Sequence, residues 1–154
     1  MKSIKRRDFL LRSCGALGLG LITGIGNVGL NSCSNNANSV NSGPPTPYDI
    51  DLKNYPALAV VNGFSKISIP GKDNGLPVIV IRKSASDFFT LSSVCTHQGC
   101  EVGNPDMSNN TITCNCHGSK FSTSGAVING PARSSLTIFP NIYDTNTNIL
   151  TITL

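Results

Sequence analysis

Two short segments in the second half of the chain place the strongest constraint on its fold. "CTHQGC" spans Cys95–Cys100 and "CNCHGSKF" spans Cys114–Phe121. Together they contain four of the six cysteines and both histidines of the 154 residues. Thiolate and imidazole are the side chains that bind zinc and iron most readily. Their concentration predicts that two loops of the chain converge on a metal centre.

The two segments contain more cysteines than a pair of ligand loops needs. Four side chains have the spacing of ligands: Cys95, His97, Cys114 and His117. They suit either zinc or an iron–sulfur cluster in which two histidines replace two cysteines on one iron. Cys100 and Cys116 remain, and in an oxidising, exported setting such a pair is most simply a disulfide. A structural zinc would not need this second link, so the cluster is favoured. Two disulfides beside surface histidines would leave the short Cys–His spacing unexplained.

The first 33 residues are typical of an export signal. "SIKRRDFLL" resembles a twin-arginine motif at Arg6 and Arg7, and a glycine-rich apolar stretch follows it. This leader accounts for the whole net charge of +4, because residues 33–154 contain seven basic and seven acidic side chains. A neutral mature region has no basic face for nucleic acid, so we expect no nucleic-acid partner.

The end of the leader offers two routes to the membrane. "LNSC" resembles a lipobox, which would make Cys33 the lipidated first residue of the mature protein. The alternative is an uncleaved signal helix, although six glycines and one asparagine in residues 14–30 weaken it as a spanning segment. Residues 34–54 begin with a polar, proline-containing stretch and are expected to form a flexible tether. This organisation predicts a bacterial envelope protein, anchored at the membrane and exposed on its periplasmic or extracytoplasmic side.

Residues 55–154 are expected to form one all-β domain. Short β-branched runs recur at 57–61, 64–69, 76–83, 88–93, 111–114, 126–128, 135–139 and 148–154. Asn-Gly and Pro-Gly pairs between several of them indicate hairpin turns. No run has a sustained helical period. The pattern predicts a small antiparallel sandwich or barrel.

The two cysteine–histidine segments resemble the two boxes of the Rieske family, Cys-Thr-His-Leu-Gly-Cys and Cys-Pro-Cys-His-Gly-Ser. "NGPA" at residues 129–132 is similar to the proline loop of that family, and the resemblance extends from residue 58 to the C-terminus. It implies a Rieske-type β fold with a two-loop cluster-binding subdomain and one [2Fe-2S] cluster. Cys95 and Cys114 would hold the buried iron, and His97 and His117 the outer one. Cys100 and Cys116 would form the disulfide of the high-potential branch.

The resemblance also assigns roles around the cluster. Ser119 would donate its hydroxyl to a bridging sulfide, and Pro131 would cover the cluster. Phe121 stands where high-potential members have a tyrosine that donates to a cysteine sulfur, which predicts a lower reduction potential. Gln98 replaces an apolar residue of the docking tip and weakens the case for a quinone pocket.

The function implied is one-electron transfer in the cell envelope between redox protein partners, such as a cytochrome or a quinol-oxidising membrane subunit. The alternative is the iron–sulfur subunit of a quinol–cytochrome c reductase or an arsenite-oxidase-like complex, and a zinc-binding structural module is more remote. Whether the chain acts as an enzyme stays open at this point. An oxygenase site is excluded within the chain, since it needs two further histidines and both histidines are already used.

Overall fold

The computed structural model describes residues 44–154. The predicted export signal, the lipobox cysteine Cys33 and residues 34–43 of the predicted tether lie outside the described residues. No helix in the described part of the chain is long and apolar enough to cross a membrane. Residues 44–154 contain strands and short 3-10 turns but no α-helix, which confirms the all-β prediction.

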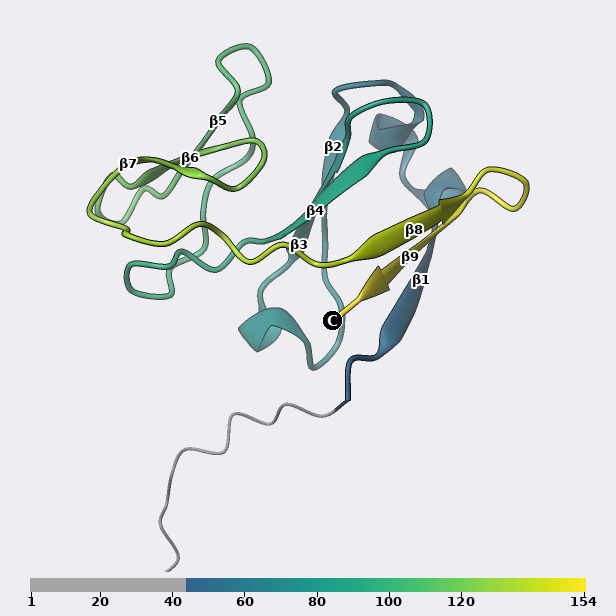
Figure 1. Cartoon of the computed structure of the whole chain (residues 1–154), viewed down its shortest axis with the longest axis horizontal. Helices are drawn as coiled ribbons and strands as arrows, with labels where there is room; N and C mark the ends of the chain where they lie inside the picture. Colours follow the sequence, from purple (N-terminus) through teal and green to yellow (C-terminus); the bar gives the residue numbers. More distant parts are fainter. Residues whose placement is uncertain (1–43) are drawn as a thin grey trace, which may run out of the picture. The chain divides into compact units, whose positions relative to one another are not determined.

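The central sheet has the order β2-β3-β4 and is antiparallel throughout (Figure 1). It consists of β2 (Phe64–Ile67), β3 (Val78–Arg82) and β4 (Phe88–Ser92). The β3 sequence "VIVIR" is apolar at four successive positions, all of them buried. A run of this kind is expected of a strand that is covered on both faces.

A second sheet, of order β1-β9-β8, brings the two ends of the described region together. It contains β1 (Pro47–Asp51), β8 (Asn141–Asp144) and β9 (Ile149–Thr153). The third sheet, of order β5-β6-β7, is built from strands of three residues: β5 (Thr111–Thr113), β6 (Lys120–Ser122) and β7 (Val127–Asn129). Figure 1 shows this third sheet on one side of β3, with β8 and β9 on the other.

The faces of the central sheet contribute to two separate apolar cores. On β3, Val78 and Val80 enter one core, whereas Ile79 and Ile81 enter the other, as the two-residue period of a strand requires. The base core comprises Ile50, Leu52, Leu58, Ile67, Ile69, Val78, Val80, Phe88, Leu150 and Ile152. The site core comprises Ile79, Ile81, Leu91, Cys95, Val102, Ile112, Cys114, Phe121, Ala132 and Leu136. Two of the predicted metal ligands are therefore part of a core.

The folded region begins earlier than predicted, so the assignment of residues 47–54 to a flexible tether is wrong. β1 pairs with β9 from Pro47 to Asp51, and the 3-10 turn Leu52–Asn54 follows it. Ile50 and Leu52 are 3% and 5% exposed in the base core. Burial of these two side chains favours order here, and the alternating "YDIDL" was the signal for it.

Two other local predictions differ from the structure. The run 57–61 was expected to be a strand but forms the 3-10 turn Pro56–Ala59, because Pro56 at its first position fixes a helical φ. The run 135–139 makes only an isolated bridge between Ile138 and Leu91. The strand of this part of the chain is β8, which begins just after the run. A third 3-10 turn, Asp73–Gly75, lies elsewhere, in the connection between β2 and β3.

Candidate metal centre

The first cysteine–histidine loop, residues 95–100, follows β4 almost directly. The Cys95 N–H donates to the Cys100 carbonyl at 2.7 Å, and the Gly99 N–H donates to the Cys95 carbonyl at 2.8 Å. Gly99 has a φ of 73°, a left-handed value that glycine adopts without steric cost. These bonds close a compact turn around Thr96, His97 and Gln98.

The second loop, residues 114–119, repeats the same design between β5 and β6. The Cys114 N–H donates to the Ser119 carbonyl at 2.8 Å, and the Gly118 N–H donates to the Cys114 carbonyl at 2.9 Å. Gly118 has a φ of 77°. Each loop thus presents its first cysteine at a buried end and its histidine further along the turn.

The two predicted ligand cysteines are buried next to each other. Cys95 and Cys114 are 2% and 1% exposed, and both are free thiols. Burial raises the pKa of the Cys114 thiol, and a hydrogen bond with the Cys95 side chain raises it further. The N–H groups of Cys116 and His117 point at the Cys114 sulfur and partly oppose that shift. Such a pair binds as thiolates only when a cation compensates the charge, so the environment suits a metal.

The two histidines form the outer part of the same site. The ring centroids of His97 and His117 lie 4.8 Å apart at an interplanar angle of 84°. His117 is exposed and His97 is partly exposed. The buried Nδ1 of His97 has no hydrogen-bond partner among the described residues, and buried polar atoms normally have one. Two buried sulfurs and two adjacent imidazoles fit either a tetrahedral zinc or a histidine-ligated iron–sulfur cluster.

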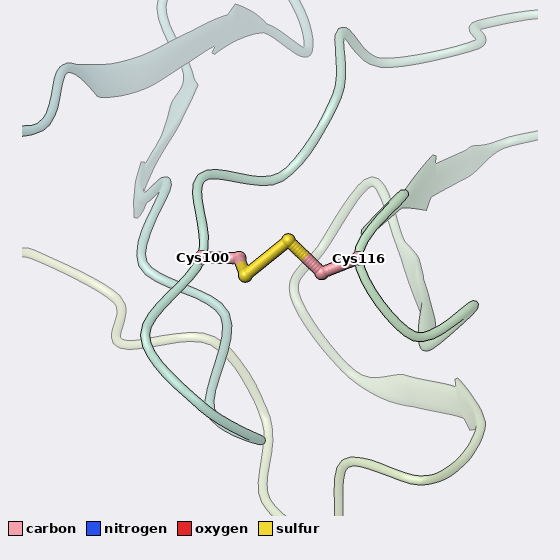
Figure 2. The surroundings of a disulfide bond; sticks show 2 residues. All are labelled: Cys100 and Cys116. Atoms are coloured by element: carbon pink, nitrogen blue, oxygen red, sulfur yellow. A yellow bond between two sulfur atoms is a disulfide. The ribbon is translucent and has the colours of Figure 1, made fainter.

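A disulfide between Cys100 and Cys116 joins the two loops, which confirms the predicted pair (Figure 2). The Cα atoms of the two residues lie 6.6 Å apart. The sulfurs of Cys100, Cys114 and Cys116 all lie within 4.8 Å of one another. Two of these atoms already share a covalent bond, so the trio is not a ligand set. It shows instead that the disulfide lies against the Cys114 thiol.

Ser119 connects the second loop to residues 130–134, the proline segment, which contains Pro131. Its side chain is fully buried, and its Oγ accepts a hydrogen bond from the Ala132 N–H at 3.0 Å. This bond leaves the hydroxyl proton available for a further acceptor. The Gly130–Pro131 peptide bond is cis. Thr96 donates to the Ser134 carbonyl at 2.5 Å, so both loops are bonded to the proline segment.

A shallow hollow of about 360 Å³ lies where the first loop meets the proline segment. It is lined by Thr96, His97, Pro131, Arg133 and Ser134. Polar and basic side chains thus surround the histidine at this edge. Gln98, at the turn of the first loop, is also exposed.

Phe121 packs inside the site core with Cys95 and Cys114. It is fully buried and pairs with Ile112 across β5 and β6. A phenyl ring cannot donate a hydrogen bond, so this position contributes packing alone.

Sequence reasoning missed an ion pair that secures the far end of the first loop. Lys66 on β2 lies 2.6 Å from the Glu101 carboxylate and donates to the Val102 carbonyl at 2.6 Å. Lys66 and Glu101 are 35 positions apart, and no local pattern links them. Only the β2–β3 register places the lysine there.

Comparison with known proteins places this geometry in a family context. The Rieske [2Fe-2S] domain family matches residues 60–140. The cytochrome b6-f complex iron-sulfur subunit of Synechococcus sp. (strain JA-2-3B'a(2-13)) is 43% identical over 88 residues, which are 56% of this chain and 50% of that protein. The carotenoid phi-ring synthase of Chlorobaculum tepidum is 39% identical over 64 residues, 42% of this chain and 10% of that protein.

The chain spans half or less of the length of these relatives. Among solved structures, the plasma membrane Rieske protein PetC3 from Synechocystis PCC 6803 is 28% identical, with a TM-score of 0.49. That match covers 68% of this chain and 91% of PetC3.

Proposed function

Because the chain belongs to the Rieske [2Fe-2S] domain family, we propose that it transfers one electron at a time between redox partners in the bacterial cell envelope. Membership implies one [2Fe-2S] cluster, which supplies a one-electron couple between about −150 and +300 mV when it is bound. The observation that carries the proposal is the pairing of two buried free thiols with two adjacent outer imidazoles.

We assign the four ligands from this arrangement. Cys95 and Cys114 would hold the inner iron, since both are buried in the site core. His97 and His117 would hold the outer iron, and the unpartnered buried Nδ1 of His97 is the atom available for it. The other ring nitrogen, Nε2, can then take up or release a proton as the charge beside it changes.

The proline segment and Ser119 would shield and adjust the site. Ser119 can donate its hydroxyl proton toward a sulfide while its oxygen accepts from the Ala132 N–H. One side chain thus links the cluster region to the proline segment. Pro131 lines the hollow beside His97 and would limit access of water there. A hydrogen bond to sulfur stabilises the more negative, reduced state and raises the potential.

Phe121 supports a potential below that of members with a tyrosine at this position. The side chain lies in the same core as both cysteines and offers no donor. Phe121→Tyr should therefore raise the midpoint potential, because the new hydroxyl would lie within this sulfur-containing core. Potentiometric titration of both proteins measures the shift, and Phe89→Tyr, at a partly buried position packed against the same core, is the control. An unchanged or lower potential in Phe121→Tyr would contradict the role of this position.

Electron paramagnetic resonance of the dithionite-reduced protein tests the proposal directly. We expect an axial or rhombic signal from a reduced [2Fe-2S] centre, together with two irons and two acid-labile sulfides per chain. Zinc in place of iron would reject the electron-transfer function and support a structural module.

A second candidate is a subunit role in a larger oxidoreductase. It is favoured by the similarity to cytochrome b6-f complex iron-sulfur subunits. Gln98 and Arg133 make the edge beside His97 polar, which favours a protein partner over a quinone pocket. Purification from solubilised membranes distinguishes the two: stable co-purification with a cytochrome b supports the subunit, and isolation of the free chain supports the carrier.

Attachment to the membrane through residues 1–46 completes the proposal. A twin-arginine signal, a lipid on Cys33 and a tether that ends at β1 would hold the domain within reach of membrane partners. Mass spectrometry of the mature protein checks this directly. An N-terminal diacylated Cys33 is expected, and Cys33→Ser should release the protein from the membrane fraction unless an uncleaved signal helix retains it.

A further inference from the structure

The segment that leads from β4 into the first loop depends on a side chain outside both boxes. β4 ends at Ser92, opposite the first residue of β3, Val78, because the strands are antiparallel. The connection from β2 to β3 therefore reaches the point where the chain leaves β4 for Cys95. Asp73 lies in this connection, in the 3-10 turn Asp73–Gly75.

Asp73 binds the departing segment through both of its carboxylate oxygens. Ser92 donates its hydroxyl to Oδ1 at 2.6 Å, and the Ser93 N–H donates to Oδ2 at 3.2 Å. The Ser92 Oγ in turn accepts from the Val94 N–H at 2.9 Å. Ser92 and Ser93 are 2% and 0% exposed. Two successive backbone donors are thus satisfied by one network of two side chains.

This network continues into the bonds of the loop itself. After Val94, the Cys95 N–H donates to the Cys100 carbonyl. Removal of Asp73 would leave a buried hydroxyl and a buried N–H without their acceptor. Such groups are costly when unpaired, so the segment would shift to reach water. Cys95 follows Ser93 by two positions and His97 by four, and any such shift would move both.

We propose that Asp73 is a positioning residue for the cluster, acting through Ser92 and Ser93 on the placement of Cys95 and His97. This inference rests on the proposed function only for its spectroscopic readout. Burial raises the pKa of the half-buried Asp73 carboxyl, and the hydrogen bonds from the Ser92 hydroxyl and the Ser93 N–H partly oppose that rise.

The test compares three variants with a matched control in the full chain. Asp73→Ala removes the acceptor, and Ser92→Ala cuts the network without changing charge. Asp73→Asn keeps one oxygen to accept from the Ser93 N–H, and its amide NH2 can donate to the Ser92 Oγ. Asp87→Asn is the control, because Asp87 also accepts a serine hydroxyl, that of Ser84 at 2.9 Å, but in the exposed β3–β4 turn.

Hydrogen exchange of residues 92–100 and the g-values of the reduced cluster are measured for each protein. In Asp73→Ala and Ser92→Ala we expect exchange to rise about tenfold or more, as for loss of a hydrogen bond to a charged group, and the g-values to shift. Asp73→Asn should stay near the parent in both measurements, and Asp87→Asn should match it.

Unchanged exchange and g-values in Ser92→Ala and Asp73→Ala would overturn the proposal. The proposal would also be overturned if Asp73→Asn changed exchange and g-values as much as Asp73→Ala while Ser92→Ala changed neither. The charge of Asp73, and not its placement of the segment, would then be the cause. If Asp73→Ala fails to fold, Ser92→Ala and Asp73→Asn still decide between these outcomes. A parent protein without an iron signal would reject the proposed function, whereas the exchange comparison would still test the placement.

Discussion

The two faces of the central sheet support regions of different construction. The base core joins the central sheet to β1, β8 and β9 and contains only hydrocarbon side chains. The site core lies on the other face and includes two cysteine thiols, covered by strands of three residues. Short strands offer few ladder bonds, so the site region needs additional links.

Those links are visible in the structure. A disulfide joins the loops, Lys66 fixes the far end of the first loop, and Ser119 bonds the second loop to the proline segment. The base also contains side-chain hydrogen bonds, from Thr151 on β9 to Asp49 on β1 at 2.7 Å and from Asn141 on β8 to the Phe88 carbonyl at 3.1 Å. The disulfide and the ion pair, however, both lie in the site region of the described residues. The comparison teaches that the base is stabilised mainly by apolar burial, whereas the site depends on individual polar and covalent bonds and, by our proposal, on the cluster.

Removal of a proposed ligand should produce the largest difference in effect between the site region and the base. In His117→Ala we expect complete loss of the cluster, seen as absent iron and no resonance signal, because the change removes one of the two proposed outer ligands. Far-UV circular dichroism should retain the β signal of the base, since the base core contains no site residue. Asn115→Ala, at an exposed position of the same loop, is the control and should keep its iron. Full iron content in His117→Ala would contradict the ligand assignment.

A matched pair of leucines tests the division between the cores. Leu150 lies in the base core and Leu91 in the site core, and both are 0% exposed. Each Leu→Ala change should lower the free energy of unfolding by about 2–5 kcal/mol, measured by denaturant titration. Only Leu91→Ala should also change the g-values of the reduced cluster. Equal spectral effects of the two variants would show that the cores behave as one.

Removal of the disulfide should have an effect confined to the site. The bridge closes a separation of 16 residues, and a loop of this size contributes about 3 kcal/mol through the unfolded state. In the double variant Cys100→Ser/Cys116→Ser, the free energy of unfolding should fall by about this amount in the cluster-free protein. With the cluster bound the fall should be smaller, because the metal also joins the loops. Denaturant titration of both forms measures it. Identical unfolding of parent and variant without the cluster would contradict this view.

The sequence was sufficient for the parts that rest on local pattern. The alternating and apolar runs at β3, β4 and β9 were predicted as strands, and the two boxes predicted the disulfide partners. Glycine permits the left-handed turns at Gly99 and Gly118 but does not dictate them, since Gly103 has no positive φ.

What the sequence could not supply was the set of contacts between distant segments. β1 pairs with β9 across the whole described region, and the alternating pattern that marks β1 does not identify this partner about 100 residues away. Asp73 and Lys66 serve the first loop only because the strand register places them beside it. An isolated acidic or basic residue in a connection carries no local sign of such a role.

The smallest expected effect concerns a kind of turn that occurs in both regions, in which an aspartate accepts hydrogen bonds from the residues that follow it. Asp106, before β5, accepts from the N–H groups of Ser108 and Asn109, and Asp144, the last residue of β8, accepts from the Asn146 N–H. Hydrogen bonds from Ser108 and Asn109 lower the pKa of Asp106 to about 2, and those from Asn146 and Thr147 lower that of Asp144.

A carboxylate with a lowered pKa in the folded state stabilises the protein above its unfolded pKa and loses that contribution as the pH falls. For Asp106 the loss should occur between the ordinary value of 3.8 and about 2. Asp106→Asn should abolish this acid dependence near β5, and Asp144→Asn should abolish its counterpart in the base. Carboxyl resonances in a nuclear magnetic resonance titration give both midpoints. If Asp106 titrated at its ordinary pKa, the turn before β5 would not depend on the charged carboxylate. The site region would then differ from the base, where hydrogen bonds lower the pKa of Asp144.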